Sequence, residues 1–235
     1  MAHIHLEDGA FSPLWLLVWS LIAAGLIAAA LFVNRKEKIP PRKIAIAAMC
    51  VSVGFAAFMV EVPTPVGPVH MNLTPLIGML VGPSLGSLVA LVINIFSAAI
   101  GHGGWGMIGA NTIVNIAEIV VGCYAFRLFR LRLRAGTYWS GFWATTIALT
   151  VGALAVVMIV AVSEIQGSQL SREETLTNTL ILAVVNIAAG VVEGIVTGYV
   201  VSFIAKVRPD MLGTERSPSP SGTAHSASPG GIRHG

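Results

Sequence analysis

The sequence predicts an all-α membrane protein with about seven transmembrane helices. Of its 235 residues, 55% are hydrophobic and only 11% are charged, whereas soluble domains carry roughly 25% charged residues. Most of the apolar runs reach about 20 residues or more, which suits a bilayer-spanning helix and not an alternating barrel strand of about 10 residues. The net charge of +3 comes mainly from short basic loops and does not indicate nucleic-acid binding.

Seven apolar segments follow one another along the chain. The first begins behind Ser12, which can cap a helix, and Pro13, which suits a first helical turn. The third is short for a full crossing and ends at Gly82-Pro83, so we expect a tight helical hairpin whose short member packs within protein. The expected segments are residues 14–33, 44–62, 71–81, 84–100, 107–126, 138–162 and 175–205.

The charged loops predict the orientation of these segments. Five positive charges lie in residues 34–43, and four arginines lie in residues 127–134. Cytoplasmic loops carry such an excess of lysine and arginine, so both loops are expected inside. The loops at 63–70, 101–106 and 163–174 are then external. The N-terminus is therefore expected outside, and the C-terminus in the cytoplasm.

The chain divides into three parts of different composition. Residues 1–13 form a polar N-terminal segment expected to chelate metal, and residues 14–207 form the transmembrane domain. Residues 208–235 are rich in Ser, Pro and Gly, which predicts a disordered cytoplasmic tail. Cys50 and Cys123 lie inside apolar segments and are interpreted as buried small residues.

The N-terminal segment could form a chelate for a transition metal. His3 and His5 stand close to the terminal amine. An amine, the next backbone nitrogen and an imidazole close fused chelate rings on one ion, and a planar set of nitrogens suits Ni(II), Cu(II) or Co(II) better than Mg(II) or Ca(II). The alternative is that both histidines are incidental. The acidic start and the lack of a cleavage site argue against a secretory signal peptide.

Four motifs stand together in this sequence, and their combination resembles one family. They are the histidine-bearing start followed by Glu7-Asp8-Gly9; Gly67-Pro68-Val69-His70 before a span; Gly101-His102-Gly103-Gly104 with Gly109-Ala110-Asn111 and Asn115; and Val192-Glu193-Gly194. Over about residues 3–207, the chain resembles the cobalt/nickel substrate-binding membrane subunit of energy-coupling-factor transporters, the CbiM/NikM family.

The resemblance implies a transport subunit of the cytoplasmic (inner) membrane. Its N-terminus would insert into a bundle of about seven helices, and its substrate would be Co(II) or Ni(II), for cobalamin synthesis or for nickel uptake. Its partners would be a membrane coupling subunit, paired cytoplasmic ATPases and a small accessory membrane protein. Because the chain has no G-x-x-x-x-G-K-[ST] motif and no nucleophile with its base, we expect no enzyme activity in it and ATP hydrolysis only in the partners.

The resemblance also implies a metal site at the N-terminus. The family's ligands are the terminal amine, the amide nitrogen and imidazole of the second residue, and a histidine that His70 resembles in position. The family usually begins Met-His, whereas Ala2 precedes His3 here. Because alanine is small, we expect Met1 to be removed. Ala2, His3 and His70 would then supply the four planar nitrogen ligands of the metal. If Met1 stayed, nitrogen atoms of the first three residues would occupy all four planar ligand positions, and none would be left for His70.

Two other histidines are candidates for metal binding or gating. His5 matches the family's spacing to Gly9 but lies too far from the amine for the fused chelate. It is an added ligand, a transient capture site or an incidental residue. His102 has no role in the resemblance, and the alternative is a polar loop residue.

Polar side chains line one face of the fifth segment. Asn111, Asn115 and Glu118 are spaced as neighbours on a helix. We expect Asn111, near the outer end, to orient the ligand loops, as groups behind the ligands do in metal sites. Asn72 and Thr74, which follow His70, are candidates for the same task.

Buried hydrogen bonding between helices is the expected role of the remaining polar groups. Asn115 is expected to bond to Asn94 or Asn186. A carboxylate near mid-membrane is costly without a function or a partner. We favour a structural role for Glu118 and Glu193, as partners of polar groups between helices; the alternative is that they face the coupling subunit.

Small residues recur every four positions on the second segment, at Ala48, Ser52 and Ala56. Such a face lets helix backbones approach closely. In the resemblance it would dock the coupling subunit, and the alternative is tight packing within the chain.

Two other functions stay open at this point. A free-standing secondary metal permease would use discontinuous helices around a midplane site, for which Glu118 and Glu193 are the acids at suitable depth. A structural or sensory membrane protein would bind metal at its N-terminus only adventitiously.

Overall fold

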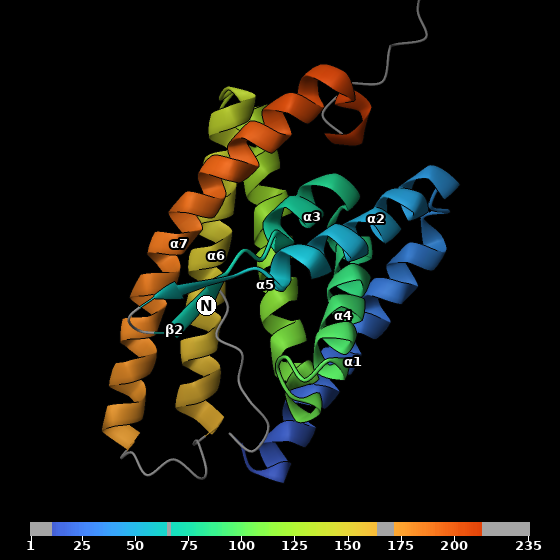
Figure 1. Cartoon of the computed structure of the whole chain (residues 1–235). Helices are drawn as coiled ribbons and strands as arrows, with labels where there is room; N and C mark the ends of the chain where they lie inside the picture. The colour runs from blue at the N-terminus through green and yellow to red at the C-terminus, as the bar shows by residue number, and fades with distance from the viewer. Residues whose placement is uncertain (1–10, 65–66, 164–171, 213–235) are drawn as a thin grey trace, which may run out of the picture.

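The computed structural model describes residues 11–64, 67–163 and 172–212, which form a helical bundle (Figure 1). The α-helices in this part of the chain are α1 (Pro13–Lys36), α2 (Pro41–Phe58), α3 (Thr74–Val81), α4 (Pro83–Ala99), α5 (Ile108–Arg127), α6 (Thr137–Ser163) and α7 (Arg172–Val207). Shorter elements join them: the strands β1 (Glu61–Thr64) and β2 (Gly67–His70), and the helical turns η1 (Trp105–Met107), η2 (Leu128–Arg132) and η3 (Pro209–Leu212). The helices follow the order of the apolar segments.

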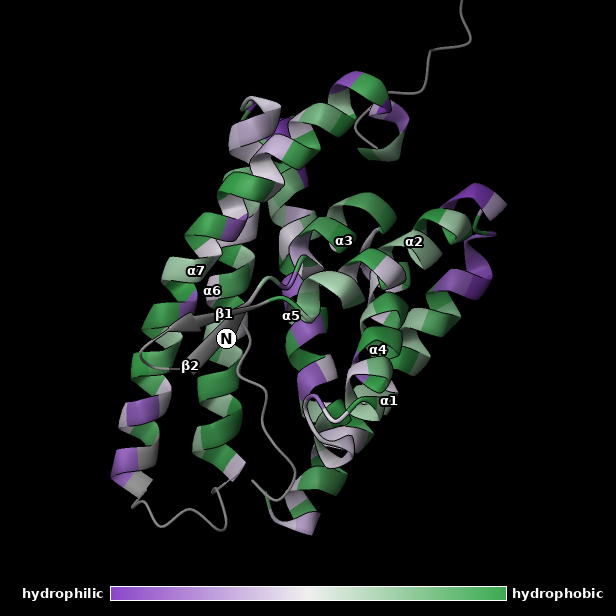
Figure 2. Cartoon of the chain, viewed as in Figure 1, coloured by the Kyte–Doolittle hydropathy of each residue, from purple (hydrophilic) through white to green (hydrophobic). Residues whose placement is uncertain are grey.

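Five of the described helical stretches are long and apolar enough to cross a membrane. They are α1, α2, the continuous stretch Trp105–Arg132, α6 and Leu176–Val207 within α7. Their outward faces expose large apolar side chains, among them Leu21 at 63% and Phe203 at 66% of full exposure. The ribbons of these helices are largely green in Figure 2, the colour of hydrophobic residues. Apolar surface of this extent suits the hydrocarbon of a bilayer. The predicted class, a helical multi-pass membrane protein, is confirmed.

α3 is the short helix that the sequence predicted. Seven of its eight residues are buried. Gly82, with a φ of +83°, ends α3 and leads directly into Pro83 at the start of α4. A positive φ is readily reached by glycine. The predicted tight helical hairpin is therefore confirmed, with its short member packed inside the bundle.

The proline-rich segment after α2 forms an antiparallel β-hairpin where a loop was expected. α2 ends at Phe58, four residues before the predicted end at Val62. A residue that precedes proline is driven out of the helical region, so Val62 before Pro63 cannot easily continue the helix. The strand register pairs Glu61 with His70 at the open end of the hairpin.

α5 is the central helix of the bundle. It packs against α1, α3, α4 and α6, while α6 runs beside α7 (Figure 1). The arginine- and lysine-rich segments gather at one end, which we call the basic end: the α1–α2 turn, the end of α5 with η2, and the end of α7. The first turn of α1 and the α4–α5 loop lie at the opposite end. Cys50 and Cys123 are buried free thiols, as predicted.

A close approach of backbones joins α3 to α5. A Cβ atom added at Gly78 of α3 would lie 2.4 Å from the carbonyl oxygen of Ile119 on α5. No real side chain tolerates that distance from backbone, so only glycine lets α3 sit this close to the central helix.

Replacing Gly78 with alanine should therefore lower the free energy of unfolding. Overpacking of this kind costs typically about 1–3 kcal/mol. Gly25→Ala is the matched control, because nothing lies within 4 Å of a Cβ added there, and alanine is preferred to glycine in a helix by roughly 1 kcal/mol. Thermal unfolding in detergent micelles should show a lower Tm for Gly78→Ala only. An equal Tm for both variants would contradict the close contact.

Candidate functional site

Two buried carboxylates meet the segment that joins the β-hairpin to α3. Glu118 of α5 is 0% exposed and Glu193 of α7 is 2% exposed. Asn72 and Thr74, on either side of Leu73, are buried as well. An acid inside a membrane protein needs compensating donors, and this segment supplies them.

Glu193 binds the backbone ahead of α3. One carboxylate oxygen accepts the N–H of Asn72 and the other accepts the N–H of Leu73, both at 2.9 Å. Leu73 caps α3 from the left-handed region, with a φ of 54°, a conformation that costs of order 1–3 kcal/mol for such a residue. The paired bonds hold this conformation, and a negative charge is favourable at a helix N-terminus.

Glu118 binds the side chains of the same segment. Its Oε2 atom accepts hydrogen bonds from the amide of Asn72 at 2.6 Å and from the hydroxyl of Thr74 at 2.5 Å. The carboxylate also lies against α6, because a Cβ atom added at Gly152 would be 2.0 Å from its Oε1 atom. We call Glu118, Glu193 and residues 72–74 the carboxylate clamp.

The clamp determines where the hairpin can lie. His70 is the last residue of β2 and precedes Asn72 by two positions. Since the clamp anchors Asn72 to α5 and α7, the backbone of His70 is held close to these helices. Both acids bond to polar groups of this segment, as expected of partners between helices, and their structural role stays a prediction. Asn72 and Thr74 contact Glu118, and their support of the metal ligands stays a prediction as well.

Asparagines form a second buried network between α4 and α5. The amide of Asn115 donates to Asn94 Oδ1 at 3.0 Å, and the amide of Asn94 donates to the hydroxyl of Thr112 at 2.9 Å. The predicted bond between Asn115 and Asn94 is confirmed. Asn111 is 5% exposed on the same helix, and its proposed role in orienting ligand loops stays a prediction.

His102 packs against the end of α2. The ring centroids of His102 and Phe58 are 5.5 Å apart at an interplanar angle of 74°, and the N–H of His102 donates to the carbonyl of Ser97 at 2.9 Å. Phe58 is followed three residues later by Glu61, the strand partner of His70. His102 thus lies near the open end of the hairpin, and its role in metal binding or gating stays a prediction.

The predicted chelating residues Ala2, His3 and His5 lie outside the described residues, as do residues 213–235 of the predicted tail. For His70, the structure describes the backbone. Within the described ranges, no group of three or more His, Cys, Asp or Glu side chains is placed to hold a metal ion. The metal-ligand set therefore stays a prediction.

The small-residue face of α2 points outward. Ala48, Ser52 and Ala56 are all exposed, and the Ser52 hydroxyl donates to the Ala48 carbonyl within the helix at 3.4 Å. This arrangement excludes the alternative that the three residues pack within this chain.

Sequence reasoning named the members of the carboxylate clamp separately and did not join them. The signal that could have joined them is chemical. Backbone N–H groups without helical partners occur where a helix begins, and the non-helical stretch before α3 offers such donors to two intramembrane acids.

Comparison with known proteins gives a consistent set of relatives. The family model of the CbiM cobalt uptake substrate-specific transmembrane region matches residues 5–211. The chain is 28% identical over 219 residues to the putative cobalt transport protein CbiM 1 of Methanocorpusculum labreanum, covering 89% of this chain and 92% of the relative. It is 26% identical over 136 residues to the cobalt transport protein CbiM of Ruminiclostridium cellulolyticum, covering 57% and 54%.

A solved structure shares the fold. The crystal structure of a transition metal transporter superposes with a TM-score of 0.75 at 21% identity, covering 87% of this chain and 93% of that chain. At this identity the likeness concerns the arrangement of the helices.

Replacing Glu193 with glutamine should loosen the clamp. The new amide group places a donor against a backbone N–H, so one of the two bonds is lost, and an unsatisfied buried group costs about 1–3 kcal/mol. Hydrogen–deuterium exchange of the amides of Asn72 and Leu73 should accelerate about tenfold, which corresponds to about 1.4 kcal/mol. Glu173→Gln is the control, since Glu173 is exposed in the first turn of the same helix. Unchanged exchange in Glu193→Gln would rule out the two backbone bonds.

Proposed function

The chain belongs to the CbiM family of cobalt uptake transmembrane proteins, and from this premise we propose that it is the substrate-specific membrane subunit of an energy-coupling-factor transporter that imports Co(II) or Ni(II). The observation that carries the proposal is the carboxylate clamp. It anchors the backbone directly behind His70, the histidine that the family resemblance assigns to the metal.

We propose that the metal is bound by nitrogen atoms only. The ligands are the amine of Ala2, the amide nitrogen and imidazole of His3, and the imidazole of His70. Such a planar set favours late first-row divalent ions. The side chain of Asn72 bonds to Glu118 and is not proposed as a metal ligand. Asn72 would instead affect the metal by fixing the backbone next to His70. Anchoring of the His70 backbone by the clamp supports the proposal, because a fixed histidine loses less freedom when it binds the ion.

We propose that the seven described α-helices lie in the membrane, with α3 as a short segment inside the bundle. The N-terminus would lie outside and insert into the bundle, and the C-terminus would lie in the cytoplasm. The gathering of the arginine- and lysine-rich segments at one end of the bundle supports this orientation. The hairpin, the N-terminal segment and the loop of His102 would then serve the outer side, where the ion arrives.

We propose that the coupling subunit docks on the outward face of Ala48, Ser52 and Ala56, and that paired ATPases drive reorientation of the complex. Exposure of small residues at helical spacing supports this, because such faces allow close helix contact in membranes. The competing permease function would need Glu118 and Glu193 for ion coupling. Both acids already bind the segment before α3, which favours a structural role for them.

Binding and uptake should respond differently to two substitutions. His70→Ala removes one of four ligands, so the affinity of the purified subunit for Co(II) should fall by more than the roughly 10- to 100-fold expected when a group behind the ligands is lost. In Asn72→Ala the affinity for Co(II) should fall within that roughly 10- to 100-fold range. Ser52→Leu should leave binding unchanged and reduce ATP-driven uptake, because a bulky side chain blocks close helix contact. Equilibrium binding and radiolabelled uptake in proteoliposomes measure the two.

The same assay separates the alternatives. Ser52→Ala is the control for Ser52→Leu and should transport normally. Uptake by the subunit alone, driven by an ion gradient without ATPases, would favour the permease. Intact uptake after removal of both His3 and His70 would favour a structural or sensory protein.

The first residues make a further prediction. The mature chain should begin at Ala2, because only then is a fourth position left for His70. Acetylation of the terminal amine should abolish metal binding while the protein stays folded, and binding should weaken as pH falls because all ligands must lose protons. Intact mass of the metal-loaded protein is the measurement. A functional, metal-loaded population that retains Met1 would contradict this arrangement.

A further inference from the structure

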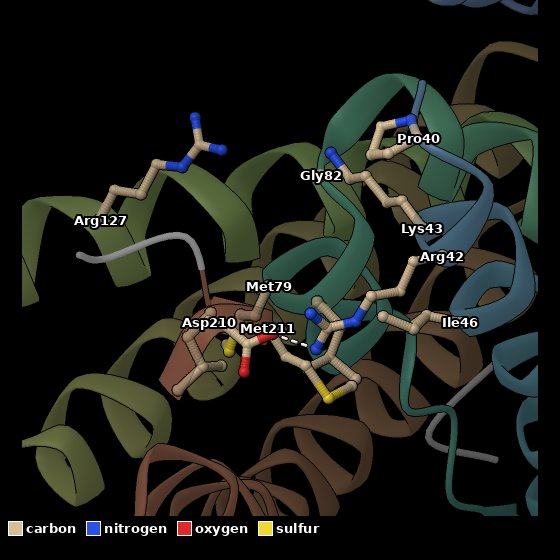
Figure 3. Close-up of a pocket in the computed structure, with 11 residues that line it drawn as sticks. Pro40, Arg42, Lys43, Ile46, Met79, Gly82, Arg127, Asp210 and Met211 are labelled. Carbon is tan, nitrogen blue, oxygen red and sulfur yellow. Dashed lines mark hydrogen bonds and ion pairs between the residues drawn. The ribbon is translucent and has the colours of Figure 1, made fainter. Parts of the chain in front are cut away.

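A pocket of about 370 Å³ opens at the basic end of the bundle (Figure 3). Arg42 and Lys43 line it from the first turn of α2, and Arg127 lines it from the end of α5. Asp210 of η3 is the acid among the described lining residues. The pocket therefore carries a net positive charge.

Two of the three cations in the pocket, Lys43 and Arg127, form no ion pair with the described residues, and the Arg127 guanidinium lies 6.0 Å from the centroid of the Tyr124 ring. Arg42 forms an ion pair with Asp210, whose other carboxylate oxygen also receives Arg208 at 3.3 Å. Lys43 extends along the other wall, with its Nζ atom 3.7 Å from the position of a Cβ added at Gly82 (Figure 3). Gly82 precedes α4, whose N-terminus adds positive potential. Lys43, Arg127 and this helix end favour an anion.

An apolar groove continues from the pocket along the bundle. It has a volume of about 220 Å³ and shares Ile46, Leu80 and Met211 with the charged pocket. Apart from the thiol of Cys50, its described lining is wholly apolar and comes mainly from α2 and α3. Its outer rim is open, because Val53 of α2 is 58% exposed.

We infer that an anionic phospholipid binds here, with its phosphate between Lys43 and Arg127 and one acyl chain in the apolar groove. A cationic pocket that opens into an apolar groove matches the two parts of this molecule and no free inorganic anion. Basic pockets between transmembrane helices on the cytoplasmic side bind anionic head groups. The inference uses the cytoplasmic placement of the basic end, which belongs to the proposed function, and it is independent of metal transport.

The test measures retained lipid on the purified full chain by native mass spectrometry. Phosphatidylglycerol and phosphatidylcholine with identical acyl chains are supplied in detergent. The wild type should keep phosphatidylglycerol in preference, and K43Q/R127Q should reduce its retention by about tenfold or more. K36Q/R132Q removes two charges of the same end outside the pocket lining and should retain the lipid as the wild type does.

A second variant tests the groove. Val53→Trp fills it and should reduce phosphatidylglycerol retention without any change of charge, whereas Val162→Trp, at a lipid-facing position of α6, should not. An unchanged Tm shows that each variant is folded.

Four results would overturn the inference: equal retention of the two lipids, equal loss in K43Q/R127Q and K36Q/R132Q, displacement of the lipid by millimolar inorganic phosphate, or no loss in Val53→Trp. Weaker capture of the coupling subunit by K43Q/R127Q with unchanged lipid retention would assign the pocket to that protein instead. Co(II) binding, measured in parallel, is expected to be unaffected, so failure here leaves the metal proposal standing.

Discussion

The demand that every buried polar group find a partner within the protein governs this structure. The stretch between the hairpin and α3 is not helical, so its N–H groups lack helical partners, and two buried acids lie against it. The acids and the segment satisfy each other's hydrogen-bonding groups. Glu193 accepts hydrogen bonds from the backbone N–H groups, and Glu118 accepts hydrogen bonds from the side chains of Asn72 and Thr74. Gly152 of α6 leaves room for the carboxylate of Glu118, so α6 can pack closely beside it.

α2 connects the parts that the proposed transport cycle would use. Its first turn lines the cationic pocket, its exposed face carries the small residues, and its last turn touches His102 and leads into the hairpin that ends at His70. A shift of α2 on docking of a partner would therefore act on the hairpin directly. The clamp resists such a shift at the other end of the hairpin, so the position of His70 depends on both.

Local signals explain what could be predicted from the sequence. Long apolar runs predicted the helices, and Gly82-Pro83 predicted the turn between α3 and α4. The helical spacing of the polar residues predicted the bond between Asn115 and Asn94. The hairpin was missed because strand pairing depends on a partner segment and not on composition. The clamp was missed as a unit because Asn72 bonds to residues 46 and 121 positions away, and only the packing of three helices brings them together. The ligands at the N-terminus were inferred from a resemblance and lie outside the described residues.

The shortness of α3 has a consequence for biogenesis. Eight residues make a helix about 12 Å long, less than half of the hydrocarbon thickness. Such a segment is too short to insert into the bilayer by itself during synthesis. Its final position requires neighbouring helices whose side chains accept hydrogen bonds from the N–H groups before α3. Glu193 comes from α7, which is synthesised after the other six described α-helices, so the bonds that anchor the segment before α3 can form only once α7 has been made. The carboxylate clamp and the hairpin that it anchors therefore take their final places only after α7 has been inserted beside α6.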